Sequence, residues 1–265
     1  MNHARQERTL PQERIMWPLV VIGAGGIGSP AVLEMAKLGF EDIILIDPDT
    51  VEGANIPTQL LWGPGDEEKL KVDVARERVL QLTGTQIGTF ACSFPDMGLN
   101  LEGLVQPEQI APNGHAIWGQ VKWNPQAPLY IVISGLDSMK ARQVAWEEVI
   151  KRNLNVPLYV EGRTGVGEAG QWLEIHTVRP HMPNDIACYE KWLYSDEEAD
   201  ETLACNSFLP VNTAIASIIA SQVSKWIMGE KYFQRIALDL ATLTLVRQEE
   251  RQTTEKEEEK KGETT

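Results

Sequence analysis

The most constraining feature of the sequence is a glycine-rich turn that directly follows a short apolar run. Residues 19–22 read Leu-Val-Val-Ile, residues 23–28 read Gly-Ala-Gly-Gly-Ile-Gly, and a helix-like segment comes next. Glycine allows the tight turn at Gly23, the approach of a phosphate to backbone N–H groups at Gly25, and close packing of helix on strand at Gly28. The start of the helix then offers N–H donors and partial positive charge to an anion. This order of strand, turn and helix predicts a nucleotide-binding unit.

A second apolar run, residues 43–46, ends in Asp47. This is about twenty residues after the turn, where such folds place a carboxylate that binds the ribose. The segment therefore predicts an α/β fold with a Rossmann-like, doubly wound sheet. NAD or FAD is the default nucleotide for this fingerprint alone, so a dinucleotide-dependent oxidoreductase is one interpretation. The residues after Asp47 favour another.

Three further groups of residues follow in order along the chain. They are Asp47, Asp49, Val51, Asn55 and Gln59, then Lys71 at the start of a helix, then Asp137 after a later apolar strand. Together with a first block of Gly23, Gly25, Gly26, Gly28 and Ser29, they resemble the ThiF/MoeB/HesA family. This family contains adenylyltransferases related to ubiquitin-activating enzymes, and the resemblance extends over residues 19–245.

The resemblance implies a sheet whose parallel N-terminal half is continued by antiparallel strands. It also implies ATP as the nucleotide, with magnesium held partly by Asp137. The implied nucleotide-binding residues are Gly23, Gly25, Gly26, Gly28, Asp47, Asp49, Asn55, Gln59, Lys71, Leu136 and Asp137. Lys71, Asn55 and Asp137 would act in catalysis. The implied reaction adenylates the C-terminal carboxylate of a ubiquitin-like or sulfur-carrier protein and releases pyrophosphate, in a homodimer.

Two of these residues also have a structural interpretation. An isolated lysine such as Lys71 is usually solvated on a helix surface. Asp137 precedes a helix expected to begin near Ser138, where aspartate is a common N-cap. The family spacing favours the functional interpretation for Lys71, and the position of Asp137 at the carboxyl end of a strand favours a metal or phosphate role.

One position departs from the family pattern. The family usually has an arginine before the glutamine at Gln59, and this chain has Thr58. Threonine supplies neither the charge nor the forked donors with which arginine neutralises a triphosphate. Either another cation compensates, with Arg5, Arg8 and Arg14 as candidates, or the chain is a nucleotide-binding family member without turnover.

Composition excludes several classes of protein. The 265 residues are 43% hydrophobic, enough for one substantial core, and the net charge of −14 disfavours nucleic acid or an anionic membrane as partner. No apolar run reaches the roughly eighteen residues of a membrane span. Three widely spaced cysteines indicate a reducing compartment. We therefore expect a cytoplasmic protein with an N-terminal arm (1–16), one domain (17–247) and a disordered charged tail (248–265).

The patterns downstream predict the rest of the sheet and its helices. We expect helices at 67–82 and 211–228, strands at 89–94, 129–134, 157–161 and 171–178, a flexible glycine loop or hairpin at 162–170, and strand-like residues at 233–246. On the first helix Leu70, Val74 and Val79, with Leu80 beside them, should face the sheet. Residues 95–128 form an insertion to which we assign no function.

The cysteines of the C-terminal half allow two predictions. Many relatives bind a structural zinc through two Cys-x-x-Cys pairs, but Cys188 is followed by Lys191 at the second position, so we predict no zinc. Residues 179–206 are the candidate for a crossover lid. Cys205 resembles the sulfur- or thioester-accepting cysteine of some relatives, and a covalent role remains open because many relatives adenylate without one.

Overall fold

The computed structural model describes residues 2–94, 129–151, 155–167, 170–194 and 207–249, together with the backbone of two short strands at 109–110 and 116–117. Eight strands form one mixed sheet in the order β10-β9-β8-β7-β6-β1-β2-β3. The parallel strands are β1 (Leu19–Ile22), β2 (Ile43–Ile46), β3 (Gly88–Phe90), β6 (Ile131–Ser134) and β7 (Leu158–Gly167). The antiparallel strands are β8 (Gly170–Val178), β9 (Phe233–Asp239) and β10 (Thr244–Glu249). This confirms the predicted parallel half continued by antiparallel strands.

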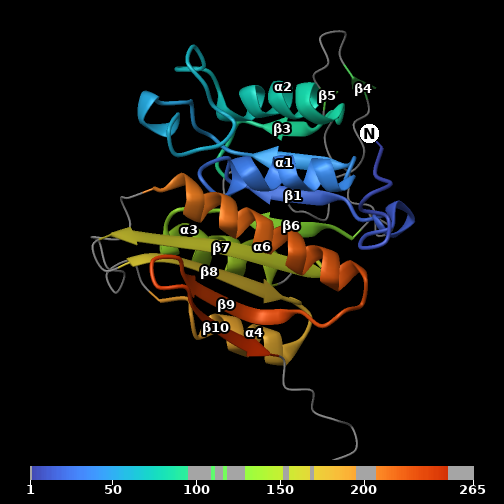
Figure 1. Cartoon of the computed structure of the whole chain (residues 1–265), viewed down its shortest axis with the longest axis vertical. Coiled ribbons are helices and arrows are strands. Elements are labelled where there is room, and N and C mark those ends of the chain that lie inside the picture. Colours follow the sequence, from blue (N-terminus) through green and yellow to red (C-terminus); the bar gives the residue numbers. More distant parts are fainter. Residues whose placement is uncertain are drawn as a thin grey trace, which may run out of the picture.

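Helices cover both faces of the sheet (Figure 1). One face carries α1 (Gly28–Leu38), α2 (Lys71–Thr83) and α6 (Leu209–Ile227). The other carries α3 (Met139–Val144), its π-helical continuation η5 (Ala145–Ile150) and α4 (Pro183–Glu190). Two short 3-10 helices, η1 (Gln12–Arg14) and η2 (Gly53–Asn55), complete the described helices. No described helix is both long and apolar enough to cross a membrane.

Neighbouring residues of each central strand enter two different cores. In β1, Leu19 and Val21 pack with the α1, α2 and α6 side, whereas Val20 and Ile22 pack with the η5 and α4 side. All four are at most 1% exposed. Because both faces are covered, the strand is apolar at every position rather than at alternate ones. The unbroken apolar runs in the sequence follow from this.

The connection of the strands creates a crevice beside β1. The chain leaves β1 through α1 to β2 and β3 on one side, then returns to β6 on the other side of β1. The loops that follow β1 and β6 therefore diverge at the carboxyl edge of the sheet. Ligands of doubly wound sheets bind at such a point.

Some predicted boundaries were wrong. The helix expected from residue 67 begins at Lys71, because Glu68 donates its backbone N–H to Val51 (2.9 Å) and Leu70 forms a β-bridge with Thr50. Leu80 is 46% exposed rather than facing the sheet. The strands expected at 89–94 and 129–134 are shorter, at Gly88–Phe90 and Ile131–Ser134.

The glycine-rich segment after β7 is strand rather than flexible loop. Residues 162–167 pair with residues 170–175 of β8, which confirms the hairpin interpretation. The stretch expected at 233–246 divides into β9 and β10 at a turn that includes Leu243, with φ of +56°. Gln248 and Glu249 belong to β10, so the predicted disorder is wrong for these two residues, and the rest of the tail lies outside the described residues.

Candidate functional site

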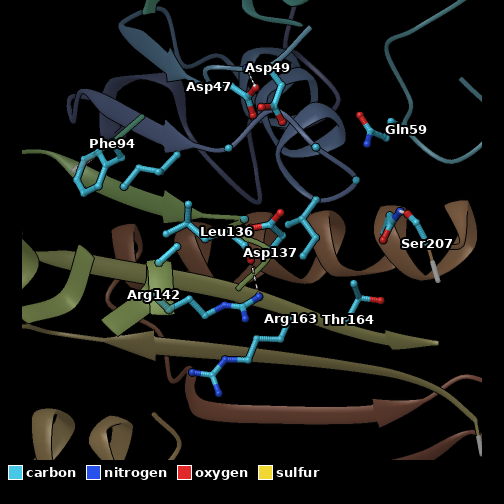
Figure 2. A pocket seen from close by; sticks show the side chains of 18 of the residues that line it. Asp47, Asp49, Gln59, Phe94, Leu136, Asp137, Arg142, Arg163, Thr164 and Ser207 are labelled. Carbon is cyan, nitrogen blue, oxygen red and sulfur yellow. Dashed lines mark hydrogen bonds between the residues drawn. The ribbon is translucent and has the colours of Figure 1, made fainter. Parts of the chain in front are cut away.

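A pocket of about 590 Å³ occupies the crevice at the carboxyl edge of the sheet. This volume is in the range of small-molecule sites. Figure 2 shows Asp47 and Asp49 on one side of the pocket and Arg142 and Arg163 on the other. Leu136 and Asp137 lie between the two sides. Residues from β1, β2, β7 and β8, and from the loop that follows β6, contribute to its wall.

The glycine turn has one part that packs and one part that is open. Gly23 has a φ of +89°, and a Cβ on Gly28 would lie 1.7 Å from the Gly23 carbonyl oxygen. Both glycines are therefore required by backbone geometry. A Cβ on Gly25, by contrast, would meet only the Gln59 side-chain nitrogen, at 4.0 Å. Gly25 thus leaves a space beside backbone N–H groups that a phosphate would fill.

Asp47 is held in place by the backbone on both sides. Its Oδ2 accepts the Ala24 N–H (2.6 Å) and its Oδ1 accepts the Asp49 N–H (2.9 Å). Burial raises the pKa of the Asp47 carboxyl, and the two N–H donors oppose this rise. Each carboxylate oxygen keeps a further lone pair for a ligand hydroxyl. The structure therefore fixes Asp47 between the glycine turn and the end of β2, in the position that the sequence predicts for a ribose-binding acid.

Lys71 begins α2 and reaches the pocket wall. Its side chain is buried, and its Nζ lies 2.8 Å from Oδ2 of Asp49, which is mostly exposed. The backbone fixes the same pair, because the Lys71 N–H donates to the Asp49 carbonyl (2.9 Å). The solvated-surface interpretation of Lys71 is therefore wrong.

Asp137 is exposed in the loop after β6 and lines the pocket. The N-cap of α3 is Ser138, whose Oγ accepts the Ala141 N–H (3.2 Å), so the capping role proposed for Asp137 is filled by its neighbour. The Arg142 guanidinium donates to the Leu136 carbonyl and so ties this loop to α3. The Asp137 carboxylate is thus left facing the pocket.

The sequence places the chain in a known protein family. The family model described as "ThiF family" matches residues 16–264. The chain belongs to the ThiF family. The resemblance drawn from the four motif blocks is confirmed.

Curated relatives match parts of this ThiF-family chain. It is 26% identical over 183 residues to the sulfur carrier protein ThiS adenylyltransferase of Escherichia coli, covering 69% of this chain and 60% of that one. It is 37% identical over 81 residues to the NEDD8-activating enzyme E1 catalytic subunit of Caenorhabditis elegans, covering 30% and 19%. The chain thus matches less than two thirds of the length of either relative.

Solved structures show the same fold. The crystal structure of SeMet PaaA has a TM-score of 0.62 at 21% identity, over 90% of this chain and 65% of that one. The structure of E. coli MccB with ATP has a TM-score of 0.59 at 20% identity, again over 90% and 65%. At these identities the likeness concerns the fold.

The segment from Asn55 to Gln59 contributes to the site only at one end. Gln59 lines the pocket. Asn55 is not among the residues that line this pocket, and its Oδ1 accepts the Glu52 N–H (3.0 Å) to close η2. The Thr58 hydroxyl bonds back to the carbonyls of Ala54 and Asn55. In this conformation neither Asn55 nor Thr58 presents its side chain to the pocket.

The N-terminal arginines do not reach the pocket of their own chain. Gln12 donates its side-chain amide to the Leu38 carbonyl (3.0 Å), at the end of α1 opposite the glycine turn. The helix between these two ends is about 16 Å long. None of Arg5, Arg8 and Arg14 lines the described pocket. The cations that do line it are Lys71, Arg142 and Arg163.

Arg142 and Arg163 belong to a buried ionic network that the sequence analysis missed. Its centre is Glu161 on β7, which is fully buried and accepts from the Tyr159 hydroxyl (2.8 Å), the Tyr189 hydroxyl and Arg163 Nε. Arg142 Nε lies 3.4 Å from the same carboxylate. Burial alone would raise the pKa of Glu161, but the two guanidinium groups lower it to about 2. Glu161 therefore stays ionised and fixes both arginines at the pocket wall.

Only one of the two cysteines in the C-terminal half lies among the described residues. Cys188 lies on α4, where burial raises the pKa of its thiol and Gln248 donates to its sulfur (3.2 Å). Within the predicted lid, residues 183–190 form this packed helix, anchored by Asp185 on Arg179 (2.9 Å). Cys205 lies outside the described residues, so its covalent role stays a prediction, as does the expected lack of zinc.

Proposed function

We propose that this protein uses ATP to adenylate the C-terminal carboxylate of a ubiquitin-like or sulfur-carrier protein. The observation that supports this best is the convergence of Asp47, Lys71 and Asp137 on one pocket at the glycine turn. These residues come from the ends of β2 and β6 and the start of α2. The relatives named adenylyltransferase and E1 catalytic subunit support the same chemistry.

The proposed reaction needs little covalent work from the protein. A carboxylate oxygen of the substrate attacks the α-phosphorus of ATP, the bond from that phosphorus to the bridging oxygen breaks, and pyrophosphate leaves. Positioning and charge neutralisation supply the catalysis. Asp47 would hold the ribose, the Gly25 turn the phosphates, and Lys71 would move from Asp49 to the triphosphate.

A magnesium ion fits the donors that the pocket offers. Magnesium is usually held by one or two carboxylates together with substrate phosphates. Asp137, exposed at the pocket wall, would supply one carboxylate, and the triphosphate would supply further oxygen ligands. Bound there, the ion would neutralise charge on the phosphates.

The test is exchange of labelled pyrophosphate into ATP in the presence of candidate carrier proteins. Adenylation predicts exchange that depends on the partner and on the free carboxylate at its end. Titration with ATP, NAD and FAD tests the oxidoreductase alternative in parallel, because that activity requires a dinucleotide to bind in place of ATP. ATP binding without exchange for any partner would refute the proposal.

The second candidate, a family member that binds nucleotide without turnover, is favoured by Thr58. We expect Thr58→Arg to lower the Kd for ATP about tenfold. The threonine hydroxyl bonds back to its own segment, whereas the longer arginine side chain would extend to the triphosphate and add a charge-assisted bond. Isothermal titration calorimetry measures this without requiring turnover, and Thr58→Ala should change the Kd less than twofold. Clear turnover by the wild-type protein removes this candidate.

Arg5, Arg8 and Arg14 do not line the pocket of their own chain, so we propose that they act between subunits. In a homodimer, an N-terminal arginine of one chain would complete the pocket of the other, and this remains part of the proposal. Exchange rates that fall at low protein concentration, together with sedimentation analysis, test it.

A further inference from the structure

Asn212 occupies an unusual position in the first turn of α6. It is fully buried, yet it lines the pocket. Its side chain links three segments that are distant in sequence, because it reaches the Thr58 carbonyl, Ser207 and the glycine turn. Figure 2 shows Gln59 and Ser207 at this end of the pocket.

The orientation of the Asn212 amide is determined by its neighbours. Its Nδ2 lies 2.9 Å from the Thr58 carbonyl oxygen and 2.8 Å from Ser207 Oγ. A carbonyl oxygen only accepts hydrogen bonds, so the nitrogen of the amide must face Thr58. The oxygen, Oδ1, therefore points the other way. It is closed to bulk water and has no hydrogen-bond partner among the described residues.

The same amide lies against the phosphate-binding turn. A Cβ on Gly26 would lie 2.5 Å from Asn212 Nδ2. Beside it, Gln59 accepts the Trp62 indole N–H with its oxygen (2.5 Å), which turns its nitrogen toward Gly25. The Gln59 amide thus offers a hydrogen-bond donor at the glycine turn, and the Asn212 amide offers an acceptor, Oδ1. Phosphate oxygens can accept from the donor, but they carry no hydrogen to donate to Asn212 Oδ1.

We propose that Asn212 Oδ1 accepts the backbone N–H of the last peptide unit of the acyl substrate. This inference rests on the function proposed above, in which a polypeptide carboxylate reaches the α-phosphate at the glycine turn. A buried acceptor without a partner is costly, and a peptide N–H is the donor that such a substrate brings next to its carboxylate. Through this hydrogen bond Asn212 fixes the position of the peptide bond that precedes the activated carboxyl group.

The experiment compares two stable mimics of the acyl-adenylate. The first is acetylglycyl-sulfamoyl-adenosine, which has the peptide N–H, and the second is the acetoxyacetyl analogue, in which an oxygen replaces that N–H. Isothermal titration calorimetry gives the Kd of each for the full-length wild-type protein. We expect the analogue to bind about tenfold more weakly, because its oxygen faces Asn212 Oδ1. In Asn212→Leu the two should differ less than threefold.

The control variant is Ser217→Ala, on the same helix. Ser217 donates to Glu34 at the surface and does not line the pocket, so the tenfold preference should persist. Equal binding of the two mimics to wild type overturns the inference without requiring any variant to fold. A preference that survives in Asn212→Leu overturns it as well. Failure of both mimics to bind would instead overturn the proposed function, and the inference with it.

Discussion

Replacing Lys71 by methionine is expected to lower partner-dependent pyrophosphate exchange by about 10²- to 10³-fold. Methionine keeps most of the length and apolar volume of the side chain but removes the charge. Lys71 is buried at the pocket wall, and its ion-pair partner there is Asp49, which is itself mostly exposed. The triphosphate of ATP carries more negative charge than one carboxylate, so the ammonium group should transfer to it when ATP binds.

Lys69→Met is the matched control for this substitution. Lys69 is two residues away, 56% exposed, and paired with Asp66 rather than with a pocket residue. We expect its exchange rate to stay within twofold of wild type. Circular dichroism should show that both variants are folded. A Lys71→Met protein with more than half of the wild-type rate would show that the lysine does not neutralise the phosphates.

The second large effect concerns stability. Glu161→Gln is expected to lower the free energy of unfolding by about 3–5 kcal/mol, the usual cost of removing one partner from a buried ion pair. The substitution keeps the shape of the side chain but leaves Arg142 and Arg163 buried without their common carboxylate. Urea denaturation followed by tryptophan fluorescence measures the loss. Glu147→Gln, which removes a surface pair with Lys151, should cost less than about 1 kcal/mol.

The lowered pKa of Glu161 predicts that the protein loses stability at acid pH. Its pKa falls from 4.5 to about 2 on folding, so its stabilising contribution is complete above pH 4.5 and is lost as the pH falls toward 2. Glu174, whose pKa is likewise lowered to about 2 by His176 and Arg235 against the effect of burial, contributes in the same window. The wild-type protein should therefore lose stability between pH 4.5 and 2. Glu161→Gln should show a shallower loss, and an identical slope would contradict the assignment.

The pocket residues around the glycine turn could be predicted from the sequence because they lie close to one another in it. The glycine turn, Asp47 and Lys71 lie within about fifty residues of one another, and each has a residue type that its chemistry demands at a fixed spacing. The strand runs were equally plain, since burial on both faces makes every position apolar. The boundary error at residue 67 came from pairing between residues 68–70 and 50–51, which no periodicity reveals.

The residues on the other side of the pocket could not be predicted from the sequence, because their contacts join segments that are distant in it. Asn212 meets Thr58 across 154 positions, and Glu161 meets Tyr189 across 28. No spacing or periodicity in the sequence identifies the partner of a single asparagine in an apolar helix or of a single glutamate within a strand. Arg142, five residues after Asp137, offered a weak signal, but Arg163 lay in a segment interpreted as flexible.

The packing of the glycine turn bears on how inactive descendants of such a protein could be recognised. Gly28 cannot accept even a methyl group, since that carbon would lie 1.7 Å from the Gly23 carbonyl oxygen. A lineage that abandoned catalysis would still have to retain both glycines in order to fold. Gly25 faces open space and is under no such constraint, so its replacement during evolution would be the earlier mark of a pseudoenzyme.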